Sequence, residues 1–569
     1  MRPARRRSGG SHDASNGAAL LAPASRQRIG GLLFLLLVGI GLAARDSITD
    51  AQWIALLWLS AAPLLLALWP DLSPRMPQIN RATLRMAAIF LTIMALCAVQ
   101  LLRVQVVMSD SFSQRVAADP ATGDIVSNPL LADAALRTPR GAILDRNGVV
   151  LAESVLVNGV QQRRYPTPDT VDVTGYFSPL LYGRTGLEAS WDDELMGLAG
   201  GNLLWQVEQD LRGAPPVGND LHLTLDAALQ QQAHALLGSR PGAVVLLDAQ
   251  TGAVLALASS PTFDANALTA LTDEQRAAAQ ASWATLTGDP RNPLVSRATS
   301  GLYAPGSTFK TVTAAAAIQR GIANADSVYE DTGSITIDSH TLVEANRPDD
   351  SVTDWTLRDA FSWSLNVVFA QIGLQLGGPA LADAARNWGW DSVIPFDIPS
   401  EPSRVFVTPG FLDNDLAVAE TAFGQGELLV TPLQMALVAA GIANEGEVMR
   451  PYLVQSITGP DGETLRETAP QGWRRGVDRA AAQQTAALMQ NAVELGALGG
   501  AYVPGYAIGG KTGTAETAGE QPHAWFIGFI GAPGQPPQYA VAVILESAGG
   551  GGQVALPIGR DLLVAAMGG

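Results

Sequence analysis

The sequence predicts a chain in three parts: a membrane region, a smaller strand-rich domain and a large α+β domain. Three observations predict this arrangement. Long uncharged apolar stretches occur only near the N-terminus, and each approaches the ~20 residues that cross a bilayer. Short strand-like stretches lie at both ends of the C-terminal part, with mainly helical spacing between them, which favours a sheet closed by its first and last strands. The length of 569 residues also exceeds one ordinary domain.

The composition excludes several classes of function. Hydrophobic residues make up 47% of the chain and charged residues 16%, which is more apolar than a typical soluble protein. The formal net charge of −17 would repel nucleic-acid phosphates, so we expect no nucleic-acid partner. Cys97 is the single cysteine, and the five histidines are scattered. An intramolecular disulfide is therefore impossible, and we expect no metal site and no cofactor.

The membrane region is expected over residues 29–107, after a tail at residues 1–28. Its three apolar segments lie at about 29–44, 51–70 and 86–105. Two alternatives stay open: residues 29–70 could form an interfacial hairpin, or the third segment alone could span the bilayer. Both alternatives still export the C-terminal part.

Arginines that flank the apolar segments predict the orientation. Those before the first segment are Arg2, Arg5, Arg6, Arg7, Arg26 and Arg28, and those between the second and third are Arg75, Arg81 and Arg85. By the positive-inside rule, the N-terminal tail is cytoplasmic and the chain after about residue 107 lies outside the cell membrane.

Residues 108–218 are expected to form a pedestal or dimerisation-type domain. Residues 140–152 (RGAILDRNGVVLA) predict strand, turn, strand, because Asn147-Gly148 favours a tight hairpin turn. We interpret this hairpin as structural support. Glu153 and Glu188 are candidates for buried ion pairs, with a signalling role in activation by a partner as the alternative.

Residues 219–569 are expected to form the C-terminal domain. Its predicted strands are 220–225, 242–248, 253–258, 506–510, 523–531 and 538–546. Apolar spacing predicts helices at 227–237, 307–320, 433–444 and 480–495. Gly321 stands where the C-terminal cap of the second helix belongs.

Lysine is rare in this chain, and its two positions are informative. Of the 36 basic residues, 34 are arginine, and the lysines are Lys310 and Lys511. Arginine stays protonated in proteins, whereas a desolvated lysine can lose its proton. Lys310 follows Ser307 by three residues at the start of a predicted helix, so the amine and the hydroxyl share one face. A neutral amine, a hydroxyl and the free N–H groups of a helix N-terminus are what an activated nucleophile needs.

Two further motifs follow along the chain. Ser364 and Asn366 belong to an SLN element in an aromatic-flanked helical stretch, and Lys511 begins a KTGT element at the end of an apolar strand. The order SxxK, SxN, KTG resembles that of active-site-serine penicillin-recognising enzymes. Further stretches are similar to penicillin-binding proteins, and most closely to the monofunctional class B members: 140–152, 303–310 (YAPGSTFK), 423–426 (FGQG) and 524–528 (AWFIG).

The resemblance implies a fold and an activity. The fold is that of the penicillin-recognising serine transpeptidases, an antiparallel sheet flanked by helices. The activity is peptidoglycan D,D-transpeptidation, with stem peptides as substrate and β-lactams as acylating inhibitors. The two apolar segments before residue 86 depart from the single anchor helix usual in class B.

The resemblance also implies a role for each motif residue. Ser307 attacks the D-Ala-D-Ala carbonyl, Lys310 takes its proton, Ser364 and Asn366 relay the proton and hold the peptide, Lys511 adds positive charge, and Thr512, Gly513 and Thr514 bind the substrate carboxylate. The backbone N–H groups of Ser307 and Thr514 would form the oxyanion hole. Whether Lys310 or Ser364 acts as the base stays open.

Two rival functions remain at this point. A membrane-bound β-lactam sensor or β-lactamase of the same fold would keep the same motifs, but the pedestal of residues 108–218 argues against it. A non-enzymatic cell-wall scaffold would have no reason to keep both lysines. The pedestal is too short for a glycosyltransferase of its own, so the resemblance implies a separate SEDS-type glycosyltransferase partner, contacted in the membrane lipid and through the pedestal.

Overall fold

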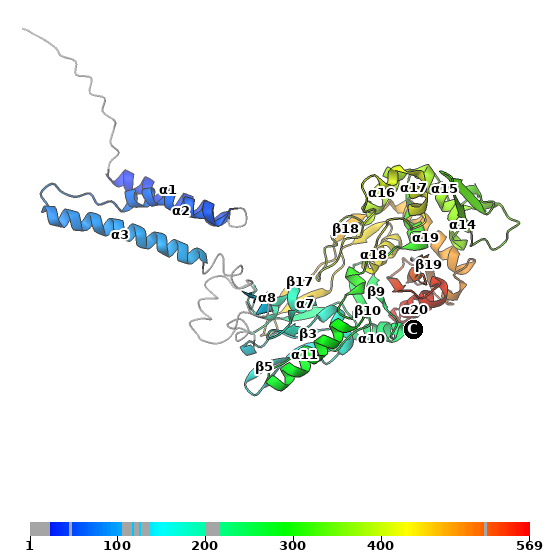
Figure 1. Cartoon of the computed structure of the whole chain (residues 1–569), viewed down its shortest axis with the longest axis horizontal. Helices are drawn as coiled ribbons and strands as arrows, with labels where there is room; N and C mark the ends of the chain where they lie inside the picture. The colour runs from blue at the N-terminus through cyan, green and yellow to red at the C-terminus, as the bar shows by residue number, and fades with distance from the viewer. Residues whose placement is uncertain are drawn as a thin grey trace, which may run out of the picture. The chain divides into compact units, whose positions relative to one another are not determined.

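The computed structural model describes residues 23–44, 48–104, 117–118, 125–126, 136–199, 217–516 and 521–568, and the fold in Figure 1 is given for these residues. The chain divides into two compact units, Met1–Asn128 and Pro129–Gly569. Each unit is described by itself.

The first unit contains three apolar helices: α1 (Pro23–Ala43), α2 (Asp50–Leu68) and α3 (Gln78–Leu102). Each is long and apolar enough to cross a membrane, which agrees with three predicted segments. The third helix begins at Gln78 rather than near residue 86, because the polar turn at its start continues the same helix.

Close packing and one polar cluster join these helices. A Cβ atom on Gly30 would lie 2.6 Å from the Pro63 carbonyl oxygen, so glycine allows α1 and α2 to approach closely. Between α2 and α3, Trp53 Nε1 donates to Gln100 Oε1 at 2.6 Å. Arg103, at the C-terminal end of α3, pairs with an Asp50 carboxylate oxygen at 2.8 Å and lies over the Trp53 ring.

A five-stranded sheet forms the centre of the second unit. Its strands are β9 (Gly242–Asp248), β10 (Val254–Ser260), β19 (Ala507–Ala515), β20 (His523–Gly531) and β21 (Tyr539–Leu545). The order is β10-β9-β21-β20-β19, and every pairing is antiparallel. The expected antiparallel sheet is confirmed for five of the six predicted strands, whereas the first one, predicted at 220–225, lies in another sheet.

Helices cover both faces of this sheet (Figure 1). One pair that packs together is α10 (Ala227–Leu237) with α20 (Gly551–Ala566), and another is α18 (Pro432–Ala443) with α19 (Arg479–Glu494). The remaining α-helices of this part are α11 (Asp273–Gly288), α12 (Arg297–Ser300), α13 (Lys310–Gln319), α14 (Leu357–Trp363), α15 (Asn366–Leu376), α16 (Gly378–Trp388) and α17 (Asp415–Ala422). The four predicted helices are present, although the one at 307–320 begins as a 3₁₀ turn, η4 (Gly306–Phe309).

Small two-stranded sheets decorate the helical part. They pair β11 (Val328–Glu330) with β14 (Asp354–Thr356), β12 (Ser334–Ile337) with β13 (His340–Val343), and β15 (Glu447–Met449) with β18 (Gly472–Arg475). The β12–β13 hairpin matters most below, because the chain that leaves it reaches the candidate site.

A second sheet has six strands in the order β17-β16-β8-β3-β4-β5. They are β3 (Ile143–Leu144), β4 (Val150–Val157), β5 (Val160–Arg164), β8 (Asp220–Leu223), β16 (Val454–Thr458) and β17 (Thr464–Glu467). The predicted strand–turn–strand at 140–152 is confirmed, with Gly148 at a positive φ of 82° in the turn. The sheet takes strands from both sides of residue 218, and the domain boundary at that position stays a prediction.

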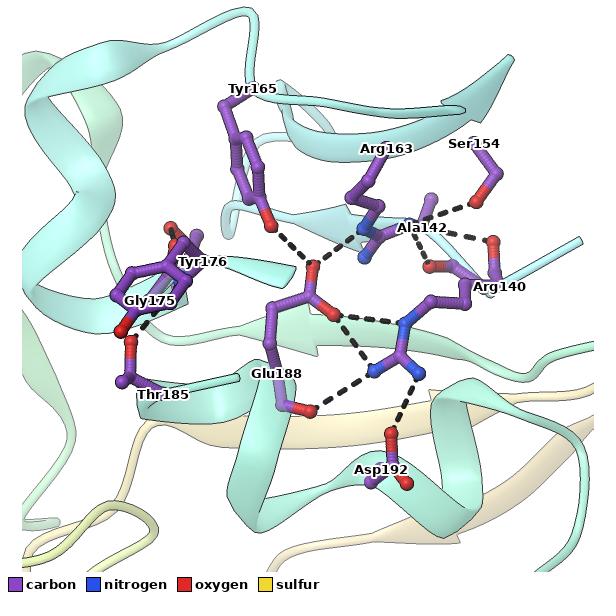
Figure 2. A network of polar contacts seen from close by, with 12 residues as sticks. Arg140, Ala142, Ser154, Arg163, Tyr165, Gly175, Tyr176, Thr185, Glu188 and Asp192 are labelled. Carbon is purple, nitrogen blue, oxygen red and sulfur yellow. Dashed lines mark hydrogen bonds and ion pairs between the residues drawn. The ribbon is translucent and has the colours of Figure 1, made fainter. Parts of the chain in front are cut away.

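A buried ion-pair network lies beside this sheet, next to α7 (Gly186–Ser190) (Figure 2). The Glu188 carboxylate is fully buried between two guanidinium groups, those of Arg140 at 2.8 Å and Arg163 at 2.5 Å. Tyr165 donates to the same carboxylate at 3.2 Å, and Arg140 also pairs with Asp192 at 2.7 Å. The prediction that Glu188 is a buried ion-pair member is confirmed.

The second candidate carboxylate, Glu153, behaves differently. It is half-buried on β4, opposite Arg164 in the strand register. Within the residues that the structure describes, no ion pair of Glu153 is found, so the prediction for Glu153 is wrong. A carboxylate that is only half-buried can stay hydrated and needs no buried partner.

Candidate active site

The turn that carries Ser307 is fixed by backbone contacts. The N–H of Gly306 donates to the Gly424 carbonyl oxygen at 2.9 Å, and Thr308 Oγ1 donates to the Pro305 carbonyl at 2.7 Å. Gly424 has a positive φ of 91°, and a Cβ atom there would lie 1.8 Å from the Gly306 carbonyl oxygen. Glycine at 424 is therefore required for the FGQG segment to hold the turn.

The two lysines of the chain meet at one hydroxyl. Lys310 and Lys511 are 0% and 2% exposed. Lys511 Nζ donates to Ser364 Oγ at 2.8 Å, and Lys310 Nζ lies 3.2 Å from the same oxygen. Lys310 Nζ also donates to the Ser364 carbonyl oxygen at 2.6 Å and to Asn366 Oδ1 at 2.7 Å. Four of the predicted catalytic residues thus form one cluster.

An unusual backbone conformation places Ser364 between the amines. Ser364 ends α14 in the left-handed region, with φ 63° and ψ 41°, which residues other than glycine seldom adopt. The turn directs both its side-chain and its carbonyl oxygen to Lys310 Nζ. The Phe369 ring lies 5.4 Å from the same nitrogen and the Phe361 ring 5.8 Å from Lys511 Nζ, so aromatic side chains complete the walls.

Burial lowers the pKa of both ammonium groups. The pKa of Lys511 falls to about 7. The pKa of Lys310 falls well below its ordinary value, because burial and the positive charge of Lys511 outweigh the opposing carboxylate of Glu344. Lys310 can therefore be neutral near neutral pH, as a base must be.

The contacts of Lys310 indicate where its lone pair lies. The Ser364 carbonyl and the Asn366 Oδ1 atom can only accept hydrogen bonds, so they engage both hydrogens of a neutral amine. The remaining position on Nζ is then free to accept a proton. Since Lys511 donates to Ser364 Oγ, the hydrogen of the Ser364 hydroxyl can point to Lys310, and the three groups form a path for a proton.

The nucleophile candidate, Ser307, is not among the hydrogen-bonded side chains of this cluster. The Ser307 hydroxyl is half-exposed and, within the described part of the chain, forms no hydrogen bond to Lys310, whose amine is turned to Ser364 and Asn366. Catalytic hydrogen bonds are often long before substrate binds.

The KTG element runs along the edge strand β19 and not, as predicted, at the end of a strand. β19 pairs with β20 from Ala507 to Ala515, so backbone pairing with β20 continues the strand through the polar KTGT residues. A Cβ atom on Gly513 would lie 2.8 Å from the Pro305 carbonyl oxygen, so glycine lets β19 lie against the Ser307 turn. Thr512 is half-buried and Thr514 exposed, and the Thr514 carbonyl lies 3.0 Å from a Cβ position on Gly306.

Two residues that the sequence did not single out also reach this site. Asn346 Nδ2 donates to the Ser364 carbonyl oxygen at 3.0 Å, and Glu344 Oε2 accepts from the Val367 N–H at 3.0 Å. Both lie on the loop after β13, outside the motifs, and no local pattern marks them.

Comparisons with known proteins place the chain in a family. Residues 242–564 match the penicillin binding protein transpeptidase domain, and residues 140–221 match the penicillin binding protein A dimerisation domain. The chain is 36% identical over 489 residues to peptidoglycan D,D-transpeptidase PbpA of Mycolicibacterium smegmatis, covering 83% of this chain and 97% of that protein. The PbpA of Mycobacterium tuberculosis is also 36% identical, over 84% of this chain and 98% of its own length.

A solved structure agrees with these relatives. The ceftriaxone acyl-enzyme complex of penicillin-binding protein A from M. tuberculosis has a TM-score of 0.70 and 34% identity, and the match covers 77% of this chain and 100% of that chain. The expected serine transpeptidase fold is confirmed. The chain, with its transpeptidase and dimerisation domains, therefore belongs to the class B penicillin-binding proteins.

Proposed function

We propose that this protein is a membrane-anchored peptidoglycan D,D-transpeptidase whose nucleophile is Ser307. The observation that carries the assignment of the site is the cluster of Lys310, Ser364, Asn366 and Lys511, held beside the Ser307 turn by the contact of Gly513 with that turn. PbpA relatives that match over 97% and 98% of their own length support the activity, and acyl-enzyme complexes of a related protein support acylation by β-lactams.

In the proposed reaction, Ser307 Oγ attacks the penultimate D-Ala carbonyl of a stem peptide. Its proton passes to the lone pair of Lys310, directly or through Ser364, and then to the nitrogen of the departing terminal D-Ala as the C–N bond breaks. Backbone N–H groups of Ser307 and Thr514 stabilise the oxyanion. An amine from a neighbouring strand then attacks the Ser307 ester, and the released Oγ regains a proton.

Recognition of the substrate follows from the same strand. We assign the terminal carboxylate of the stem peptide to the hydroxyls of Thr512 and Thr514, next to Gly513, with Lys511 supplying positive charge. A β-lactam carries a carboxylate and a reactive carbonyl in a similar arrangement. Its leaving nitrogen stays tethered after ring opening, so the acyl-enzyme persists.

The membrane region supports a location in the cell membrane. The three helices α1–α3 are long enough to span it, and the arginines around them favour a cytoplasmic N-terminus with the catalytic domain outside. Residues 108–218 are too few to form a glycosyltransferase domain, and we propose a SEDS-type glycosyltransferase as a partner within the lipid bilayer. Protease protection of the C-terminal domain in spheroplasts would contradict this orientation.

Labelling with a fluorescent penicillin tests the assignment. We expect one covalent adduct on Ser307, lost in Ser307→Ala and nearly lost in Lys310→Arg, because arginine cannot supply a neutral amine. Ser351→Ala, at an exposed serine of the same unit, is the matched control and should label as wild type does. Unchanged labelling of Ser307→Ala would refute the assignment, and hydrolysis of the adduct within seconds would favour a β-lactamase instead.

A further inference from the structure

We propose that the loop after β13, residues 344–346, is a positioning element of the active site. In this proposal Asn346 holds the Ser364 carbonyl, which accepts a hydrogen bond from the Lys310 amine. Glu344 holds the first turn of α15, which carries Asn366. The inference rests on the proposed function and adds two positioning residues that lie outside the SxxK, SxN and KTG motifs.

The first contact concerns the carbonyl oxygen of Ser364. This oxygen accepts one hydrogen bond from Lys310 Nζ at 2.6 Å and a second from Asn346 Nδ2 at 3.0 Å, so both of its lone pairs are engaged. The left-handed backbone of Ser364 is unfavourable for a residue with a Cβ atom and persists only where its surroundings hold it. Asn346 lies outside α14 and α15, and its hydrogen bond to the Ser364 carbonyl holds this turn from a separate segment of the chain.

The second contact concerns the N-terminus of α15. The N-cap residue, Leu365, makes no side-chain cap hydrogen bond, so the first N–H groups of the helix need another acceptor. Glu344 Oε2 accepts from the Val367 N–H at 3.0 Å. Its Oε1 accepts from the N–H groups of Ala345 and Asn346 at 3.0 and 2.9 Å. One carboxylate therefore ties the loop that carries Asn346 to the helix that carries Asn366.

The charge of Glu344 also acts on the catalytic amine. The charged groups that shift the pKa of Lys310 are Lys511 on β19, which lowers it, and Glu344, which raises it. Of the helices packed against α13, α15 carries no charged residue, and the charged residues of α16 and α19 are exposed: Asp383, Arg386, Arg479 and Glu494. Glu344 is thus the group that opposes Lys511 in setting the pH at which Lys310 becomes neutral.

Acylation kinetics with a fluorescent penicillin separate the two roles. The full-length protein in detergent is assayed from acid to alkaline pH, and the initial binding constant is resolved from the maximal acylation rate. We expect Asn346→Ala to lower the maximal rate roughly five- to tenfold, the equivalent of one lost hydrogen bond. Its initial binding constant should be unchanged, and the acid limb of the pH–rate profile, which is the fall in rate toward low pH, should stay at the same pH. Asn346→Gln keeps an amide donor and should recover part of the rate.

The charge variant gives a different readout. Glu344→Gln keeps the shape and an acceptor oxygen but removes the negative charge, so the acid limb should move to lower pH. Thr341→Ala, which removes the exposed Thr336–Thr341 contact of the same hairpin, is the matched control and should match wild type in rate and pH profile. Melting temperatures check that the variants fold, and the exposed position of Asn346 keeps that test available even if Glu344→Gln is unstable.

The outcomes distinguish this inference from the function on which it rests. If wild type forms no adduct that depends on Ser307, the proposed function itself fails. If the adduct forms and Asn346→Ala acylates at the wild-type rate, while Glu344→Gln keeps the wild-type acid limb, the positioning loop is overturned and the proposed function stands.

Discussion

Glu188→Gln removes the central charge of the buried pedestal network, and its cost can be worked from the contacts. The carboxylate is 0% exposed and both guanidinium groups that bind it have side chains 1% exposed. Burial alone would raise the pKa of Glu188, but Arg163 and Arg140 lower it by more, so the side chain is ionised in the folded protein. The variant leaves two buried guanidinium groups without their shared anion.

The loss of stability in Glu188→Gln can be estimated from the contacts that remain around the two guanidinium groups. Removal of one partner from a buried ion pair costs ~3–5 kcal/mol. Glutamine keeps one oxygen as an acceptor, and Asp192 still pairs with Arg140 at 2.7 Å, so we expect a loss of about 3 kcal/mol, at the lower end of that range. For a unit of this size the melting temperature should fall by about 3 °C.

Thermal and urea unfolding of the protein in detergent would measure this loss. Arg184→Ala is the control, because the Arg184–Asp192 pair at 3.0 Å is partly exposed, at 46% and 16%, and such pairs contribute only ~0–1 kcal/mol. The lowered pKa of Glu188 means that its ion pairs stabilise the fold above the ordinary carboxyl range and lose this effect as the pH falls through the lowered value. The difference between wild type and Glu188→Gln should therefore shrink below about pH 4. Equal costs for Glu188→Gln and Arg184→Ala at neutral pH would refute the reasoning.

Three further changes test other parts of the structure. Gly513→Ala should slow penicillin acylation at least about tenfold, because its Cβ would lie 2.8 Å from a carbonyl oxygen of the nucleophile turn. Gly499→Ala is the control and should acylate normally, because a Cβ there meets nothing within 4 Å. Normal acylation by both variants would show that the close approach of Gly513 is unimportant. The second-order acylation rate should fall above about pH 7, because Lys511, with its pKa of about 7, loses its charge there. Lys511→Arg should move this alkaline fall of the rate to higher pH. If the alkaline fall does not move, it belongs to the titration of another group. Trp53→Phe should lower the stability of the helical unit in detergent by about 1 kcal/mol, because it loses the 2.6 Å hydrogen bond to α3. Trp58→Phe, at a residue 71% exposed, is the control and should not change the stability. Similar melting of both variants would contradict this prediction.

For the catalytic domain, the sequence predicted the type and bounds of the helices and strands better than it predicted which strands pair with each other. Strand and helix types follow from local periodicity, and so the strands at 242–248 and 523–531 and the helix at 227–237 have the predicted bounds. Periodicity does not say which sheet a strand joins. The strand predicted at 220–225 is β8, which pairs with β3 and β16 in the six-stranded sheet and not with the strands of the five-stranded sheet.

The candidate site divides in the same way. Spacing of three residues predicted that Ser307 and Lys310 share a face, and the order of the motifs predicted a shared site with Ser364. The left-handed turn at Ser364 has no sequence signal, since serine adopts it only under tertiary constraint. Asn346 is likewise invisible, because a side chain that reaches a backbone oxygen 18 residues away leaves no local pattern.

The contact of both side chains with one oxygen explains why these two residues are lysine and not arginine. Both ammonium groups contact one oxygen, Ser364 Oγ, at 2.8 and 3.2 Å, and both are buried. Two like charges so close in a desolvated site disfavour each other, so the pair releases one proton far more readily than an isolated lysine does. A guanidinium group at either position would keep its charge and could not accept a proton. In this chain 34 of the 36 basic residues are arginine. Lysine is therefore found at the two positions where the side chain must either become a neutral amine or share a proton with a neighbouring amine.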